Sequence, residues 1–248
     1  MLAYRTIGSG TPCVFLHGFL ESSSMWKYIP LVSLEQQSVL VDLPGHGASP
    51  ISDKVSESQS IASMADEVIE LIEHLGIHEF NIIGHSMGGY VALEVKNKRP
   101  SCKKVILLNS NYWEDAEQKK RDRKRIAILA FEAKRFFIQK AIPSLFLSPD
   151  NYQGEVSSLL EEALRVDSEA IAISSLAMAA RKNWTSLLPK EDFYLIHGAQ
   201  DRLVSLDQID DLVIDSAHFF IIKSGGHMSH IEAPEEVMLA LNAIFTKD

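Results

Sequence analysis

Cysteine is scarce in this sequence, and long apolar runs are missing. Its two cysteines lie in different contexts, Cys13 entering an apolar stretch and Cys102 in a polar turn, so a disulfide between them is not expected. No apolar run is long enough to cross a bilayer, and the first residues do not have the charged-then-apolar order of a secretion leader. These features lead us to expect a cytoplasmic protein that is not associated with a membrane.

The chain also has fewer basic than acidic residues. The chain has 24 Lys and Arg against 33 Asp and Glu, for a net charge of −9. Nucleic acids and anionic membranes attract basic surfaces, so neither is expected as a partner. The basic run at residues 119–125 is interrupted by Asp122, and we interpret it as a solvated helix face. The histidines show no spacing typical of metal ligands, so no metal site is predicted.

Apolar segments alternate with helical ones along most of the chain, which is typical of a sheet built from crossover connections. With 248 residues and 46% hydrophobic composition, the chain can bury a substantial core. Strands are expected near residues 2–7, 12–17, 37–42, 79–84, 103–109, 192–197 and 218–222. Helices are expected near residues 60–75, 86–98 and 234–246.

The segment Gly84-His85-Ser86-Met87-Gly88 lies between a predicted strand and a predicted helix. A sharp strand-to-helix turn around a serine exposes the hydroxyl as a nucleophile. The strained turn requires small residues two positions before and after it, and Gly84 and Gly88 meet that requirement. The context therefore indicates that Ser86 is a catalytic nucleophile.

A nucleophilic serine needs a base, and the base needs a group that orients it. Asp201 ends the polar turn after the predicted strand at 192–197, and His227 follows Gly225-Gly226 after the strand at 218–222. Residues that follow parallel strands meet at one edge of the sheet. The chain order Ser86, Asp201, His227 is the one expected for loops at that edge.

With two further motifs, Val14-Phe15-Leu16-His17-Gly18-Phe19 and Val41-Asp42-Leu43-Pro44-Gly45-His46-Gly47-Ala48-Ser49, the chain resembles the α/β-hydrolase fold family. The resemblance implies a mostly parallel central sheet flanked by helices, with a helical cap inserted after the sixth standard strand. It also implies that the backbone N–H groups of Phe19 and Met87 form the oxyanion hole, and that neither a metal nor a cofactor is required.

The alternation of strands and helices stops between the strands at 103–109 and 192–197. Helix-like stretches follow one another there, at 114–140, 152–166 and 168–181, with a break expected at Pro143. We therefore predict a core domain formed by residues 1–110 and 189–248 and a helical cap at 111–188. Residues 170–180 are apolar on nearly every face, so this segment is expected to pack inward.

Two residues compete with the predicted triad members. His230 comes three residues after His227 but lies nearer the start of the next helix, without the flexible glycines. Asp207 follows Ser205 and is interpreted as part of the first turn of a helix. The remaining histidines are given structural roles: His17 and His46 within their loops, His85 pointing away from the nucleophile, and His197 ending its strand.

Together these features predict a serine hydrolase that cleaves an ester or related acyl bond of a small molecule, as a monomer or a homodimer. Ser86 in place of an aspartate argues against a haloalkane dehalogenase. Lyases of the same fold usually have an arginine four residues after the nucleophile, where this chain has Tyr90, so carbon–carbon bond cleavage is an alternative with less support. A slow-turnover small-ligand receptor would keep the same triad and is the other alternative.

Overall fold

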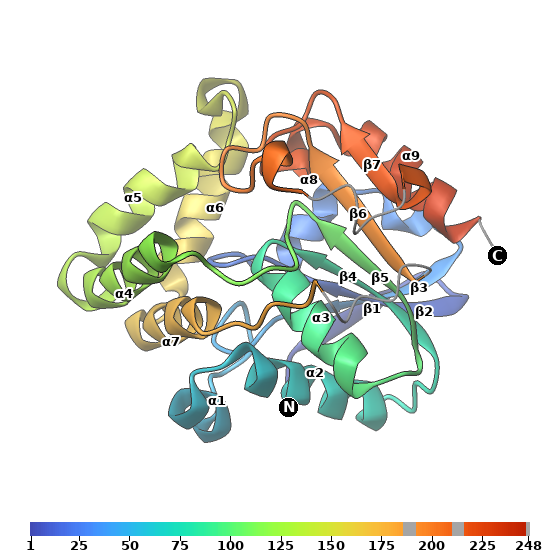
Figure 1. Ribbon diagram of the computed structural model, residues 1–248, viewed down its shortest axis with the longest axis horizontal. Helices are drawn as coiled ribbons and strands as arrows, with labels where there is room; N and C mark the ends of the chain where they lie inside the picture. The colour runs from blue at the N-terminus through green and yellow to red at the C-terminus, as the bar shows by residue number, and fades with distance from the viewer. Residues whose placement is uncertain (186–191, 210–215, 247–248) are drawn as a thin grey trace.

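The computed structural model describes residues 1–185, 192–209 and 216–246 of the chain. Its centre is a seven-stranded sheet with the order β1-β3-β2-β4-β5-β6-β7 (Figure 1). The edge strand β1 runs antiparallel to β3, and the other neighbouring strands are parallel. The strands are Tyr4–Ile7 (β1), Thr11–Leu16 (β2), Gln36–Val41 (β3), Phe80–His85 (β4), Cys102–Leu108 (β5), Phe193–Gly198 (β6) and Phe219–Ile222 (β7). The predicted mostly parallel sheet is thus confirmed.

Both faces of the sheet are buried, as parallel strands require. Side chains alternate along each strand, so Val14 and Leu16 of β2 join one core cluster while Cys13 and Phe15 join the other. The first cluster is closed by α2 (Ile61–His74) and α3 (Met87–Lys98), and the second by α9 (Pro234–Phe245). In Figure 1, α2 and α3 cover one face of the sheet, and α8 and α9 lie on the other.

The helices of the core begin where their sequence signals lie. The Ser60 hydroxyl caps α2 by accepting a hydrogen bond from the N–H of Ser63. Pro234 occupies the first turn of α9, where its missing N–H costs nothing. Two short helices, α1 (Asp53–Ser58) and α8 (Ser229–Glu232), were not predicted. The short 3-10 helices are η1 (Ser23–Tyr28), η2 (Leu31–Ser33), η3 (Pro149–Tyr152), η4 (Leu206–Gln208) and η5 (Ser216–His218).

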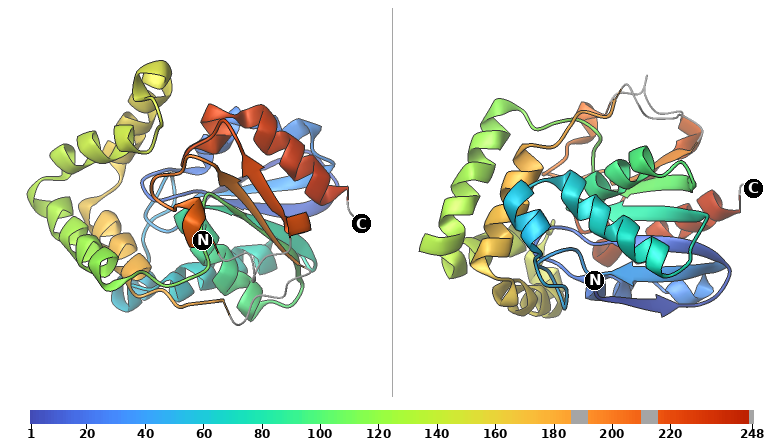
Figure 2. Two further views of the ribbon diagram at one scale, coloured as in Figure 1. Left: turned by 45° about the horizontal axis from the view of Figure 1, so that its top comes forward. Right: turned by 90° about the horizontal axis from the view of Figure 1, so that it is seen from below.

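Four helices follow one another between β5 and β6: α4 (Glu117–Glu132), α5 (Lys134–Ser144), α6 (Gln153–Arg165) and α7 (Ser168–Ala179). They form a layer beside the sheet, with α4 packed on α7 (Figure 2). They bury a third apolar cluster between them. The apolar segment expected to pack inward is buried along most of α7. The predicted boundary of the cap, at residues 188 and 189, lies outside the described residues.

The first cap helix differs from the prediction. The single helix expected at 114–140 is two helices, because the backbone leaves the helical conformation at Ala133 (φ −150°, ψ 38°). The expected break at Pro143 is wrong in position, since Pro143 lies inside α5, which ends one residue later at Ser144. A proline disrupts the turn that precedes it, and here only the end of a short helix is affected.

Two carboxylates tie these helices to the core. Glu162 of α6 accepts a hydrogen bond of 3.0 Å from the Ser24 hydroxyl of η1. Glu232 of α8 accepts from the N–H of Leu147, at 2.7 Å, and from the N–H of Gly226, at 2.8 Å. The second carboxylate therefore connects the helical layer to the loop that carries His227. In the described parts of the chain, no helix combines the length and apolar character needed to cross a membrane.

Candidate active site

The turn between β4 and α3 holds Ser86 in a strained conformation. Its backbone has φ 48° and ψ −114°, a region that residues other than glycine seldom adopt. A Cβ atom at Gly84 would lie 2.3 Å from the backbone of Gly88, and one at Gly88 would lie 2.6 Å from the backbone oxygens of Leu16 and His17. Both glycines are therefore required for steric reasons, as the sequence predicts.

The structure brings together the three side chains predicted as a triad. His227 Nε2 lies 3.1 Å from Ser86 Oγ, and His227 Nδ1 lies 2.9 Å from Asp201 Oδ2. The chain of contacts runs from a hydroxyl through an imidazole to a buried carboxylate. In this arrangement Nδ1 donates to Asp201, which leaves the lone pair of Nε2 directed at the hydroxyl proton.

The carboxylate of Asp201 is held in its charged form. Burial opposes ionisation, but the interaction with His227 and the N–H groups of Leu203 and Val204, at 2.8 and 3.1 Å, outweigh it and hold the pKa of Asp201 well below its usual range. Asn109 donates one hydrogen bond to Asp201 Oδ2 (3.1 Å) and another to the carbonyl oxygen of Gly226 (2.8 Å). Asn109 thus joins the acid loop to the histidine loop.

The two predicted oxyanion-hole residues flank the serine. Met87 is the first residue of α3, so its N–H group lies at the positive end of the helix dipole. Phe19 lines the same cavity as Ser86. Within the described part of the chain, no hydrogen bond from either backbone N–H is found. Both N–H groups are therefore without a hydrogen-bond partner among the described residues.

Glu21 and His85 form a buried ion pair beneath these loops. Glu21 Oε2 accepts hydrogen bonds from the N–H of Gly18 at 2.6 Å and from His85 Nδ1 at 3.0 Å. The other ring nitrogen of His85, Nε2, lies 3.0 Å from the carbonyl oxygen of His227. Both nitrogens face acceptors, so the ring fits best as an imidazolium.

The electrostatics of this pair agree with its geometry. Burial works against both charges, but the attraction of Glu21 raises the pKa of His85, and the attraction of His85 lowers the pKa of Glu21. The structural role expected for His85 agrees with these contacts, since its ring bonds to Glu21 and to the backbone of His227 and makes no hydrogen bond to Ser86 in the described structure. Glu21 was not identified from the sequence, where it is an acid two residues after Phe19 and directly before three serines.

His230 and Asp207, the alternatives to His227 and Asp201, are not part of this hydrogen-bonded chain. His230 is fully buried behind His85, with ring centroids 4.8 Å apart, and neither of its nitrogens has a hydrogen-bond partner among the described residues. Burial and the nearby His85 charge lower the pKa of His230 to about 3, so its ring is neutral. Asp207 is an exposed residue in the first turn of the 3-10 helix η4. Neither residue contacts Ser86 or His227 through a hydrogen bond in the described structure.

Two other histidines have the structural roles predicted for them. His17 Nδ1 donates to the carbonyl oxygen of Gly18 at 2.7 Å, and its Nε2 accepts from the N–H of Leu43 at 2.9 Å. His46 Nδ1 donates to the carbonyl oxygen of Pro44 at 3.0 Å. Burial lowers the pKa of both rings. Both neutral rings therefore bond to the backbone of the loops that contain Gly18, Leu43 and Pro44.

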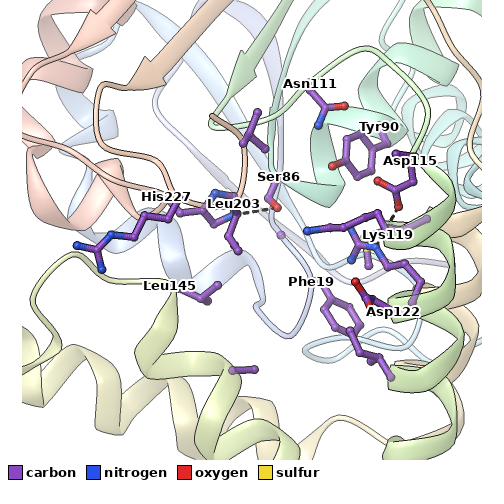
Figure 3. Close-up of a pocket in the computed structure, with 18 of the residues that line it drawn as sticks. Phe19, Ser86, Tyr90, Asn111, Asp115, Lys119, Asp122, Leu145, Leu203 and His227 are labelled. Atoms are coloured by element: carbon purple, nitrogen blue, oxygen red, sulfur yellow. Dashed lines mark hydrogen bonds and ion pairs between the residues drawn. The ribbon is translucent and has the colours of Figure 1, made fainter. Parts of the chain in front are cut away.

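A cavity of about 1050 Å³ opens above Ser86 and is roofed by α4 and α5. Figure 3 shows Phe19, Tyr90, Leu145 and Leu203 around it. The basic run at 119–125 is not simply the solvated face we expected. Its exposed members follow that prediction, but other members line the cavity, because α4 turns one side toward Ser86. The cavity-lining members of the run are Lys119, Lys120, Asp122 and Arg123.

Tyr90, at the position where lyases of this fold usually have arginine, is covered by an arginine from another segment. The Arg181 guanidinium lies 4.1 Å from the centre of the Tyr90 ring and 2.7 Å from Asp115 Oδ1. Arg181 does not line the cavity above Ser86. Among the residues that the structure describes, no cluster of His, Cys, Asp and Glu is arranged to hold a metal ion.

Comparison with known proteins agrees with this architecture. Among curated proteins, the chain is 25% identical over 246 residues to the dihydrolipoyllysine-residue acetyltransferase component of an acetoin cleaving system from Pseudomonas putida, covering 96% of this chain and 64% of that protein. The chain therefore spans less than two thirds of that relative. It is 23% identical over 256 residues to the (E)-2-((N-methylformamido)methylene)succinate hydrolase of Acinetobacter baylyi, covering 97% of this chain and 92% of that enzyme.

Among solved structures, a thermophilic esterase from Thermogutta terrifontis, determined with malate bound, superimposes with a TM-score of 0.89. It is 28% identical in sequence, and the match covers 99% of this chain and 93% of the esterase. The family profile described as "Alpha/beta hydrolase family" matches residues 13–240. The protein belongs to the α/β hydrolase family.

Proposed function

We propose that the protein is a serine hydrolase that cleaves an ester or related acyl bond of a small molecule through an acyl-enzyme intermediate. The observation that carries the proposal is the hydrogen-bonded chain Asp201–His227–Ser86 at the floor of the cavity. The similarity to an esterase and to a hydrolase over nearly the whole chain supports it. All the required groups come from side chains and backbone, so the reaction needs no cofactor.

The reaction starts with proton transfer. His227 Nε2 takes the proton of Ser86 as the hydroxyl oxygen attacks the carbonyl carbon of the substrate, and Asp201 stabilises the imidazolium that forms. The oxygen of the tetrahedral intermediate accepts hydrogen bonds from the N–H groups of Phe19 and Met87. Each such donor typically lowers the barrier by about 3 to 4 kcal/mol.

The intermediate then collapses to products in two stages. The bond to the leaving group breaks, and the imidazolium of His227 gives its proton to the departing alcohol. Water enters and loses a proton to His227 while it attacks the ester of Ser86. A second tetrahedral intermediate releases the carboxylic acid and restores the Ser86 hydroxyl. The net reaction consumes one ester and one water and yields one acid and one alcohol.

Turnover of short-chain 4-nitrophenyl esters by the wild type and the Ser86→Ala variant tests the proposal. We expect multiple turnovers by the wild type and a loss of about six orders of magnitude in the variant, the usual effect of removing such a nucleophile. Ser33, which is exposed and lies outside the cavity lining, provides a control as Ser33→Ala. Hydrolysis retained by Ser86→Ala would contradict the proposal.

The same assay separates the two alternatives. A receptor of the same fold would form one persistent adduct for each protein molecule and then stop. A carbon–carbon hydrolase would leave simple esters untouched and act on a diketone. No residue of the described structure favours either alternative, because Tyr90 occupies the lyase arginine position and Arg181 lies outside the cavity lining.

A further inference from the structure

One cationic side chain of the cap extends into the cavity above Ser86 without a partner. Lys119 belongs to the first turn of α4 and is partly buried. In Figure 3 its side chain extends from the helix into the cavity, with its amine end toward Ser86 and His227. Within the described ranges of the chain, its ammonium group makes no hydrogen bond and no ion pair.

Two neighbouring cations that also line the cavity, Lys120 and Arg123, form ion pairs. Lys120 lies 3.2 Å from Glu114 and 3.1 Å from Glu117. Arg123 Nε lies 3.2 Å from Asp115 Oδ2. Both cations therefore have carboxylate partners in the cavity lining, whereas Lys119 has none among the described residues. Arg202 also reaches the cavity without a partner among the described residues, but it is exposed to solvent.

Lys119 lies among charged side chains but is paired with none of them in the described structure. The charges that act most strongly on it are those of Arg123, Asp115, Arg181 and Asp122, and neither carboxylate forms a hydrogen bond or ion pair with its ammonium group in the described structure. Burial and the nearby Arg123 lower the pKa of Lys119. A partly desolvated ammonium without a counterion is unfavourable, and a ligand that brings one negative charge would supply that counterion.

We propose that the substrate is an ester that carries a free carboxylate, and that Lys119 binds this carboxylate while Ser86 attacks the ester carbonyl. This inference rests on the proposed function and adds the substrate class to it. A carboxylate fits better than a dianionic phosphate because Lys119 is one unpaired cation beside the carboxylates of Asp115 and Asp122, which would repel a second negative charge.

The apolar part of the cavity suits the hydrocarbon chain that connects the carboxylate of such a substrate to its ester group. Apolar side chains of the core and of α5 line it, among them Phe19, Ile142 and Leu145. A hydrocarbon chain would pack against them while its two polar ends reach Lys119 and the oxyanion hole. Monoesters of straight-chain dicarboxylic acids combine these three features, a carboxylate, a hydrocarbon chain and an ester. Hydrogen bonds to a charged group then select the carboxylate end, while the apolar wall selects chain length.

The test compares monoethyl esters of dicarboxylic acids, from succinate to suberate, with the neutral diethyl esters of the same acids. For the best chain length, we expect kcat/KM of the wild type to favour the monoester over the diester by about 10-fold to 100-fold, the range typical of a hydrogen bond to a charged group. Lys119→Met should lower this ratio by about the same factor, mainly through KM. Lys119→Arg keeps the charge and should restore most of the preference.

Lys124 provides the matched control, because it lies on the same helix, is exposed and does not line this cavity. The Lys124→Met variant should keep the wild-type ratio. A wild-type ratio near one, or a ratio that Lys119→Met leaves unchanged, would overturn the inference. Inhibition by inorganic phosphate as strong as inhibition by the dicarboxylate itself would indicate an anion site without carboxylate preference, and would also overturn it.

A binding measurement separates this inference from the proposed function. If the wild type hydrolyses neither ester, the proposed function fails, and calorimetric titration of monoethyl adipate into the wild type and Lys119→Met proteins still decides the role of Lys119. Binding that weakens about 10-fold or more in the variant would support the carboxylate site. Equal affinity for the two proteins, or no binding to the wild type, would refute it.

Discussion

Glu21 and His85 meet 3.0 Å apart beneath the active site, and each side chain is only 1% exposed. Glu21 also accepts a hydrogen bond from the N–H of Gly18, which precedes Phe19, and His85 bonds to the carbonyl oxygen of His227. The pair therefore connects the loop that carries Phe19 to the backbone of His227. The nucleophile loop contributes His85 itself, which directly precedes Ser86. One buried ion pair therefore connects the three loops that carry Phe19, Ser86 and His227.

Replacing Glu21 by glutamine should destabilise the protein and slow catalysis together. The neutral amide leaves the buried charge of His85 without a partner, and breaking a buried pair typically costs about 3 to 5 kcal/mol. Urea unfolding at pH 7 measures the loss. Glu35→Gln is the control because Glu35 is exposed. Equal stability of the Glu21→Gln and wild-type proteins would show that the pair contributes nothing to the fold.

Asp201→Asn should abolish most activity without unfolding the protein. The Leu203 and Val204 N–H groups can still bond to the amide oxygen, but the amide nitrogen then faces His227 Nδ1 and forces the imidazole proton onto Nε2, which points at Ser86. Loss of the correct tautomer in a triad of this kind typically lowers kcat by about four orders of magnitude. Ester hydrolysis at saturating substrate measures it.

The matched control is Asp207→Asn, which changes the exposed rival carboxylate in η4. Its kcat should stay within about twofold of the wild type, as expected for a surface substitution away from the site. If Asp207→Asn lost activity and Asp201→Asn kept it, the assignment of the orienting acid would be reversed.

His230 should make the protein less stable in mild acid. Its pKa of about 3 in the folded protein lies below the value of about 6.5 in the unfolded chain. The unfolded state therefore binds more protons between these values, so the stability contributed by the neutral ring is present above about pH 6.5 and is lost as the pH falls toward 3. His230→Phe removes this effect.

The measurement is the free energy of unfolding as a function of pH for both proteins. Below about pH 6, the free energy of unfolding should depend less steeply on pH in the variant than in the wild type. The slopes should differ by about 1.4 kcal/mol per pH unit, which corresponds to one proton. Above pH 7.5, where the neutral form prevails in both states, the two curves should run parallel. Identical slopes in acid would mean that His230 is protonated in the folded state.

The chain order of strands and turns made much of the site predictable. Ser86 lies between two glycines at a strand-to-helix turn, and Asp201 and His227 each follow a predicted strand. Because the carboxyl ends of parallel strands lie at one edge, the sheet prediction alone brings these three segments together. The structure places the three side chains within hydrogen-bonding distance.

The parts that were missed depend on packing rather than on local pattern. The Glu21–His85 pair joins residues 64 positions apart, and a buried ion pair has no periodicity that a sequence reveals. The basic run at 119–125 has the same composition whichever side of α4 faces the cavity, so the position of Lys119 follows only from the packing of α4 on α7. The helix break at Ala133 carries neither glycine nor proline.

Labelling with a fluorophosphonate, followed by mass spectrometry of the intact protein and its peptides, tests the central claim most directly. The account predicts one adduct per chain, located on Ser86, absent in Ser86→Ala and formed far more slowly in His227→Gln, which cannot act as the base. His230→Gln should be labelled at the wild-type rate. An adduct on another residue, or labelling of Ser86 at an equal rate in the His227→Gln variant, would contradict the account.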